Sequence, residues 1–235
     1  MAAVDELDGS GLRAHGLDTV ADQGFLARLT PALIEELLRS SHSAWYPAGT
    51  LLAPPPVGTG PAVVLAGRLR YFLLAPDGRQ LTVTYNTPGD LIGNIVQDSQ
   101  NLSARFEVMQ PSTLAHLDEN QMAALMAARP ALALAMLDES LVGLRRAFYL
   151  LAGHAFMSVR VRVARDLWER ARTGDAVIEG THLNLTHQSL ADATGSVREV
   201  VARTIRDLRH EGVLATDAKG VTILDPDALA TAACL

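Results

Sequence analysis

The sequence predicts an α+β protein with an N-terminal β-roll, a long helix, and a C-terminal helix-turn-helix unit closed by a β-hairpin. The roll is indicated by short apolar runs, separated by turn residues, between Tyr46 and Leu117. The long helix is indicated by a heptad repeat after Pro130, and the C-terminal unit by two short helical segments joined at Gly195. With 235 residues, 49 % of them hydrophobic and 20 % charged, the chain can bury a substantial core.

Charge and cysteine content exclude several classes of protein. The net charge of −6 argues against a protein that coats nucleic acid by bulk attraction, so any such contact must be local. The single cysteine, Cys234, excludes an internal disulfide and an iron–sulfur cluster. No apolar stretch approaches the roughly 20 residues that span a bilayer, and no signal segment opens the sequence. We therefore expect a cytoplasmic protein without membrane contact.

The N-terminal part is expected to consist of an arm and the β-roll domain. Residues 1–24 mix Gly, Asp and Ala without a period, which is typical of a flexible arm. Residues 25–129 then form the roll domain, which begins with a short helix capped by Thr30. Apolar and polar residues alternate over residues 81–85, as they do in a half-buried strand.

Residues 130–157 are expected to form one long helix with an apolar seam. Such a seam packs against a partner helix, which could belong to a second copy of the chain, or it packs on the chain's own β-domain. We favour a homodimer, because Leu132, Met136 and Tyr149 supply further apolar surface that can cover the β-domain. The candidate dimerisation residues are spaced alternately three and four apart: Leu134, Leu137, Leu141, Leu144, Phe148 and Leu151.

Residues 158–235 follow the element order of a winged helix. A helix over residues 159–172 precedes a short strand, a helix, a tight turn, a second helix and two apolar runs that form a hairpin. Thr186 can cap the first helix of the helix-turn-helix, and Ser196 can cap the second. Gly195 supplies the bend between these two helices.

The second of these helices carries an outward face suited to DNA. An arginine fork pairs with guanine and a carboxylate accepts from cytosine, so Arg198, Glu199 and Arg203 fit the role of base-reading residues. The alternative for Glu199 is a capping box with Ser196, in which it only closes the helix. Arg206 fits a phosphate contact or a solvated charge. The candidate DNA-binding residues are Arg198, Glu199, Arg203, Ser196, Thr186, Gln188 and Arg206.

Gly195 followed by Arg198-Glu199-x-x-x-Arg203 resembles the cyclic-AMP receptor/FNR (Crp/Fnr) family of bacterial transcription regulators, and the resemblance covers residues of about 25–224. It implies a jelly-roll-like domain of the cyclic-nucleotide-binding type that senses an effector, a dimerisation helix and a winged helix-turn-helix. It also implies that Arg198, Glu199 and Arg203 touch the bases of a TGTGA-type half-site. Double-stranded DNA with a palindromic operator and RNA polymerase are the implied partners.

The sequence departs from the family pattern at the effector pocket. Members that bind cyclic AMP carry a Glu after the Gly-Asp-x-x-Gly turn and an Arg-Ser pair about ten residues later, where this chain has Asn94 and Leu102-Ser103. Arg105 lies on the other side of Ser103, so a buried cyclic phosphate would lack its charge-assisted partner. We expect an effector other than cyclic AMP, and Asn94, Ser103 and Arg105 are the candidate pocket residues.

Three alternatives compete with a DNA-binding regulator. A haem-sensing variant needs an axial ligand such as His42, His116 or His154, but a lone His is more often structural, and no cofactor is assigned. A cupin-like metal enzyme needs several His in the barrel, and only His116 lies between residues 46 and 117, so we expect no metal site, no catalytic residue and no enzyme. A sensor that binds a protein partner is disfavoured by the Arg-Glu-Arg spacing.

Overall fold

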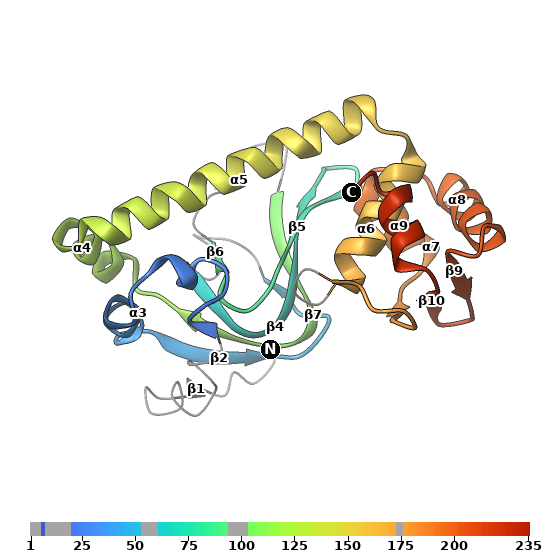
Figure 1. Cartoon of the computed structure of the whole chain (residues 1–235). Coiled ribbons are helices and arrows are strands. Elements are labelled where there is room, and N and C mark those ends of the chain that lie inside the picture. The colour runs from blue at the N-terminus through green and yellow to red at the C-terminus, as the bar shows by residue number, and fades with distance from the viewer. Residues whose placement is uncertain (1–5, 8–19, 53–60, 94–102, 173–175) are drawn as a thin grey trace. The chain divides into compact units, whose positions relative to one another are not determined.

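A computed structural model describes residues 6–7, 20–52, 61–93, 103–172 and 176–235, which form two antiparallel sheets and two groups of helices (Figure 1). Two compact units are formed, one by residues 1–74 with 83–146 and the other by residues 75–82 with 147–235. Within the described ranges, no helix is both long enough and apolar enough to cross a bilayer.

The N-terminal unit is built on an antiparallel sheet in the order β1-β2-β7-β4-β5, with β3 beside β7 and β6 beside β4. Its longest pair, β4 with β7, shifts register between Val64 and Leu69. Gly67 lies in this irregular stretch with a φ of +89°, and a Cβ there would collide with Ser112. The strands are β1 (Glu6–Leu7), β2 (His42–Tyr46), β3 (Leu51–Leu52), β4 (Ala62–Leu74), β5 (Gln80–Asn86), β6 (Leu91–Ile92) and β7 (Ser103–His116).

Short helices and the start of a long helix cover this sheet. As the sequence predicted, Thr30 caps α3, where its Oγ1 accepts from the backbone N–H of Leu33 at 3.4 Å. The buried faces of α3 and of α5 join the strands in one apolar cluster, which includes Ile34 and Leu132. The elements are the 3₁₀-helix η1 (Leu26–Arg28), α3 (Pro31–Leu38), α4 (Glu119–Ala128) and α5 (Pro130–Phe156).

The predicted flexible arm extends too far toward the C-terminus. Val20 is buried in the same apolar cluster as Phe25, and the backbone N–H of Leu26 donates to Gly89 O at 3.2 Å. Gly24 lies so close to Asp90 that a Cβ would come within 2.5 Å of the carboxylate. The sequence signal was weak because packing, rather than a local period, orders residues 20–24.

Two histidines and a tyrosine lie together at the β2–β7 pair. Tyr46 Oη and His116 Nε2 are 2.9 Å apart, and the rings of His42 and His116 stack with centroids 4.9 Å apart. Burial, and then the nearby His42, lower the pKa of His116 from 6.5 to about 4. The folded state therefore binds fewer protons than the unfolded state between these two values.

We expect the free energy of unfolding to fall by about 2 kcal/mol between pH 7 and pH 5, because protonation of His116 then favours the unfolded chain. Urea unfolding at both pH values measures this difference. His116→Gln should remove most of the pH dependence, whereas His182→Gln, at an exposed histidine, should leave it. An unchanged pH dependence in His116→Gln would contradict the assignment.

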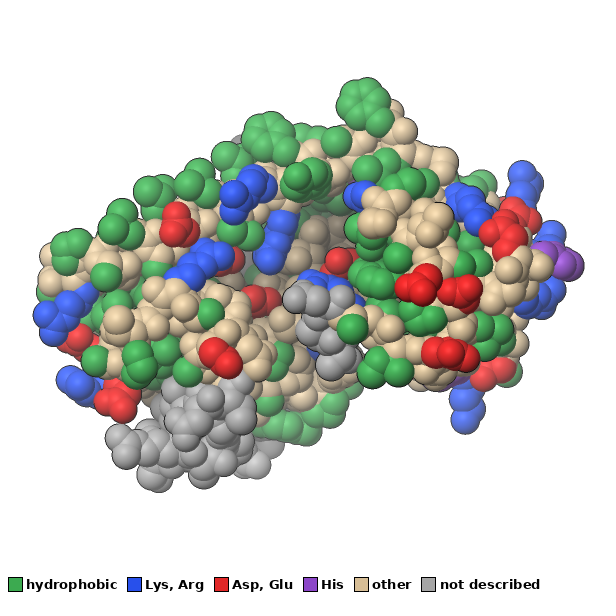
Figure 2. All heavy atoms as spheres, in the orientation of Figure 1, with side chains coloured by type: hydrophobic (Ala, Val, Ile, Leu, Met, Phe, Trp, Pro, Cys, Tyr) green, Lys and Arg blue, Asp and Glu red, His purple; other side chains and the backbone are tan. Residues whose placement is uncertain are grey.

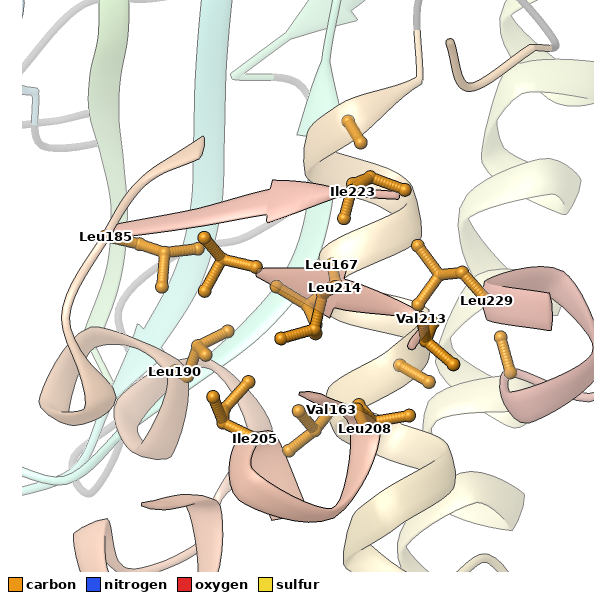
Figure 3. Packing of buried hydrophobic residues seen from close by; sticks show 14 of the residues in the cluster. Val163, Leu167, Leu185, Leu190, Ile205, Leu208, Val213, Leu214, Ile223 and Leu229 are labelled. Atoms are coloured by element: carbon orange, nitrogen blue, oxygen red, sulfur yellow. The ribbon is translucent and has the colours of Figure 1, made fainter. Parts of the chain in front are cut away.

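The C-terminal unit packs helices around a small three-stranded sheet in the order β8-β10-β9. Side chains from α6, α7, α8 and the hairpin point toward one another in a single core, with Leu167, Leu190 and Leu208 fully buried (Figure 3). The elements are α6 (Val159–Ala171), β8 (His182–Asn184), α7 (His187–Thr194), α8 (Arg198–His210), β9 (Leu214–Thr216), β10 (Gly220–Ile223) and α9 (Pro226–Ala232).

The last helix, α9, was not predicted from the sequence. Its start carries a recognisable signal, since the side chain of Asp225 accepts from the backbone N–H of Ala228 and Pro226 occupies the first turn. Arg165 of α6 holds the other end, where its Nε donates to Ala233 O at 2.7 Å. The helix adds Leu229 to the core and leaves the predicted element order of the winged helix intact.

Candidate nucleic-acid interface

The turn between α7 and α8 depends on a residue in the left-handed conformation. Gly195 has a φ of +59° and ends α7, and the N–H of Ser196 donates back to Ala191 O at 3.0 Å. At the start of α7, Thr186 Oγ1 accepts from the N–H of Ser189, and the Ser189 hydroxyl accepts from the N–H of Thr186. The predicted cap at Thr186 and bend at Gly195 are confirmed.

The predicted cap of α8 is wrong. The helix begins at Arg198, so that Val197 is the N-cap residue, and no side chain caps it. Ser196 lies one residue too early to reach the first turn, and Glu199 is the second helical residue rather than the third that a capping box requires. The structural alternative for Glu199 is thereby removed, although a carboxylate in the first turn still suits the helix dipole.

The outward face of α8 presents its charged side chains to solvent. Arg198, Glu199 and Arg203 are exposed, and none of their side chains makes a hydrogen bond or ion pair with any residue in the described part of the chain. Four arginines and two carboxylates give α8 a net charge of +2 in a chain whose net charge is −6. Figure 2 shows such blue side chains along the edge of the view where α8 lies. This face can bind an anionic ligand that offers both acceptors and donors.

A groove with a volume of about 590 Å³ runs beside α8, between the start of α7 and the β9–β10 hairpin. It brings together four residues that the sequence singled out, namely Thr186, Gln188, Arg198 and Arg206, whereas Glu199 and Arg203 lie on the adjoining side of the helix. Ser196 does not line it. The Gln188 side chain is partly engaged, because its Nε2 donates to Asp192 Oδ1 at 2.8 Å.

Arg209 and the hairpin tip also line this groove and were not predicted from the sequence. Arg209 follows Arg198 by eleven residues, which is three helical turns, so its place on the same side could have been predicted. At the hairpin tip, Asp217 Oδ1 accepts from the N–H groups of Lys219 at 2.7 Å and Gly220 at 2.8 Å. These hydrogen bonds lower the pKa of Asp217 and hold the tip in a tight turn.

The apolar seam of α5 is exposed along its whole length. All six predicted seam residues, from Leu134 to Leu151, have 46–66 % of their surface exposed, and Figure 2 shows hydrophobic side chains following the course of α5. Leu132 is fully buried and Met136 packs beside it, as the sequence predicted for the face toward the β-domain. Tyr149 was expected there too, but 70 % of its surface is exposed.

The predicted effector residues are only partly described. Asn94 lies outside the described residues, and Ser103 is the first residue of β7. Arg105 Nη1 donates to Ala104 O at 2.6 Å. Arg68 and Arg70 lie in the same unit and were not singled out from the sequence. Both occur at alternate positions of an otherwise apolar strand, and this pattern could have identified them.

Both of these β4 arginines are buried against aromatic rings. The guanidinium of Arg68 lies 5.3 Å from the Tyr85 ring centroid, and that of Arg70 lies 4.6 Å from the Phe72 ring centroid. Arg70 Nη1 also donates to Glu107 Oε2 at 3.1 Å. Two arginine side chains therefore belong to the folded interior of the β-domain.

The histidines named for haem take part in protein contacts. His116 Nε2 is within hydrogen-bond distance of Tyr46 Oη, and His154 lies beside Gly195. Among the described residues, no three His, Cys, Asp or Glu side chains are grouped so that they could hold a metal ion.

Comparison with known proteins places this geometry in a family. Residues 161–232 match the model of the Crp-like helix-turn-helix domain. The chain is 32 % identical over 165 residues to the transcriptional regulator LdrP of Thermus thermophilus, an alignment that covers 69 % of this chain and 82 % of LdrP. The chain belongs to the Crp/Fnr family of transcriptional regulators. As a Crp/Fnr regulator it has DNA as its macromolecular partner.

Two further Crp/Fnr proteins are similar over nearly the whole chain. The CRP-like cAMP-activated global transcriptional regulator of Mycobacterium tuberculosis is 26 % identical over 219 residues, covering 91 % of this chain and 97 % of that protein. The crystal structure of a Crp/Fnr-family regulator from Eubacterium rectale superposes with a TM-score of 0.72 at 22 % identity, covering 89 % of this chain and 97 % of the other. This likeness confirms the fold class.

Proposed function

We propose that this Crp/Fnr regulator is a homodimer that reads a palindromic, TGTGA-like operator through Arg198, Glu199 and Arg203. The observation that carries the proposal is the exposed face of α8, where these three side chains stand without partners in the described chain. In the major groove, arginine reaches guanine O6 and N7, and a carboxylate accepts from cytosine N4. One such face reads only a half-site, so a dyad of two chains accounts for a palindrome.

The groove beside α8 supports a second class of contact. Arg206 and Arg209, with Thr186 and Gln188 at the start of α7, line the groove that Arg198 of the base-reading face also borders. Their spacing suits the sugar–phosphate backbone, which positions the protein but carries no sequence information. Lys219 at the exposed hairpin tip adds the one cationic side chain of the hairpin.

The α5 seam supports the dimer. An exposed row of six large apolar side chains at heptad spacing needs a cover, and a second copy of the same helix matches it by symmetry. Each C-terminal unit, with its helix α8, would be one DNA-reading head of the dimer. Pairing the two α5 helices would hold the two reading heads at a fixed separation, which a palindrome with half-sites about 34 Å apart requires. RNA polymerase is the further partner that we propose for a regulator of transcription.

The test of the function is selection of bound sequences from a random duplex pool by the purified protein. We expect a palindrome whose half-sites resemble TGTGA. Enrichment of sequences without dyad symmetry, or of none at all, would contradict the proposal.

The effector is proposed to be a small molecule other than cyclic AMP. The sequence lacks the Arg that precedes the serine in cyclic-AMP-binding members, since Leu102 precedes Ser103. Arg105 does not replace it, because it follows the serine and its Nη1 donates to the carbonyl of Ala104. The buried cyclic phosphate of cyclic AMP would be left without the cation that offsets its desolvation.

Titration calorimetry with cyclic AMP is expected to show no saturable binding at micromolar concentrations. Restoring the cation with Leu102→Arg, combined with Asn94→Glu, is the matched variant and should gain measurable affinity. Tight binding by the unmodified protein would contradict the proposed effector class and leave the DNA-reading proposal untouched.

A further inference from the structure

Arg162 of α6 joins the ends of two other helices. Its Nη1 donates to Met157 O at 3.1 Å, directly after α5, and its Nε donates to Thr194 O at 3.2 Å, at the last residue of α7. The final carbonyls of a helix have no partner inside the helix and carry partial negative charge. One guanidinium therefore satisfies carbonyls at two helix ends and holds the ends together.

A second contact joins the same two places. The ring of His154, in the last turn of α5, lies so close to Gly195 that a Cβ at residue 195 would be 2.9 Å from His154 Cε1. Burial, and then the positive charge of Arg162, lower the pKa of His154 below its ordinary value, so the ring is neutral at pH 7. A neutral ring can pack against the turn without repelling the neighbouring guanidinium.

Gly195 is the turn from which α8 starts, so both contacts bear on the direction of the reading face. All five residues of these contacts lie in the C-terminal unit, and α5 continues without a break from the exposed seam to His154. A rotation or shift of the end of α5 must therefore move the α7–α8 turn or break the Arg162 hydrogen bonds.

We propose that Arg162 and His154 are positioning residues that fix the recognition helix relative to the end of α5 and so set how well two reading heads match one palindrome. This inference rests on the proposed dimeric function. The affinity for two half-sites depends on both heads engaging without distortion, whereas the affinity for one half-site depends on a single head. Loosening the link should cost affinity only where two heads must fit together.

Helix α6 also provides a matched control for this test. Arg165 makes the same kind of contact one turn along the helix, with Nε to Ala233 O at 2.7 Å and Nη2 to Cys234 O at 3.2 Å, but at the end of α9. Arg162→Gln and Arg165→Gln therefore remove similar carbonyl contacts, and only the first of these contacts involves α5 and α7.

The experiment measures the dissociation constants of the full-length variants for the selected palindrome and for a duplex with one half-site, together with their melting temperatures. We expect Arg162→Gln to weaken palindrome binding roughly tenfold and half-site binding less than about twofold. Arg165→Gln should leave both constants unchanged. Arg162→Lys should restore part of the loss, because an ammonium group still donates to a helix-end carbonyl. His154→Ala, which keeps the hydrogen bonds, should show the same selective loss at smaller size.

Each other outcome is decisive. An equal loss of affinity for both duplexes would show that the reading head itself is damaged. No loss of affinity would show that the contacts of Arg162 do not matter for binding. Either result overturns the positioning role. If Arg162→Gln does not fold, His154→Ala decides between these outcomes. If the unmodified protein binds the palindrome no more tightly than the half-site, the dimeric function fails, and the positioning role fails with it.

Discussion

Replacing Arg198 with alanine is expected to abolish most sequence-specific binding. A bidentate arginine–guanine pair contributes about 1–3 kcal/mol of discrimination, and a dimer loses two of them, so the affinity for the selected operator should fall by about 2–6 kcal/mol. The side chain is exposed and has no partner in the described chain, so the fold should be unaffected. Fluorescence anisotropy with the operator, and with operators altered at single base pairs, measures the affinity and the base preference.

Arg206→Ala is the comparison for this result. Arg206 lies on the same helix and lines the groove that we assign to the phosphate backbone. Its loss should weaken binding to all sequences alike and reduce the slope of log K against log salt by about 1 for each subunit. If Arg198→Ala instead behaves like Arg206→Ala, leaving the base preference unchanged, then α8 does not read bases through Arg198.

The helix-turn-helix could be predicted closely because its signals are local. Gly195 is required by a left-handed turn, Thr186 caps α7, and the apolar face of α8 repeats at helical spacing. The cap at Ser196 failed for a reason that sequence does not show. Both Ser196 and Val197 can precede a helix, and the turn geometry after Gly195, rather than the residue type, decides where α8 begins.

Features that depend on tertiary packing were not predictable in the same way. Val20 carries no periodic signal, yet it is buried in the cluster around α3. The groove beside α8 is formed together with the β9–β10 hairpin, which is separate from α8 in the sequence. Because the position of the hairpin could not be predicted, Arg209 was not recognised as a groove residue. Arg162 read as one of several arginines on a helix, and its contacts at two helix ends could not be inferred from spacing.

The sequence predicted the position of the α5 seam and favoured its use in a dimer. A heptad repeat can cover its own domain or meet a second chain, and apolar residues beside the seam favoured the second chain. In the N-terminal unit, α5 already buries Leu132 and Ala135, on a different side from the exposed Leu134 and Leu137. The helix therefore has one face in its own core and another in solvent, which is why we propose a dimer rather than an internal contact.

Leu141→Asp at the middle of this seam is expected to convert the dimer into monomers. In the proposed dimer each copy would bury an unpaired carboxylate. An uncompensated buried charge costs about 3–5 kcal/mol, which is enough to weaken dimerisation by roughly a thousandfold. Leu141 is exposed in the single chain, so the monomer should keep its fold and melting temperature. Sedimentation velocity measures the oligomeric state.

The control is Ala131→Asp, which places the same charge at an exposed position of α5 outside the seam and should leave the dimer intact. The Leu141→Asp monomer should still bind a duplex with one half-site but lose the additional affinity for the palindrome, because the second head is no longer tethered. A variant that remains dimeric would show that the two chains meet through another surface. A monomer that binds the palindrome as tightly as the unmodified protein would show that α5 pairing plays no part in reading DNA.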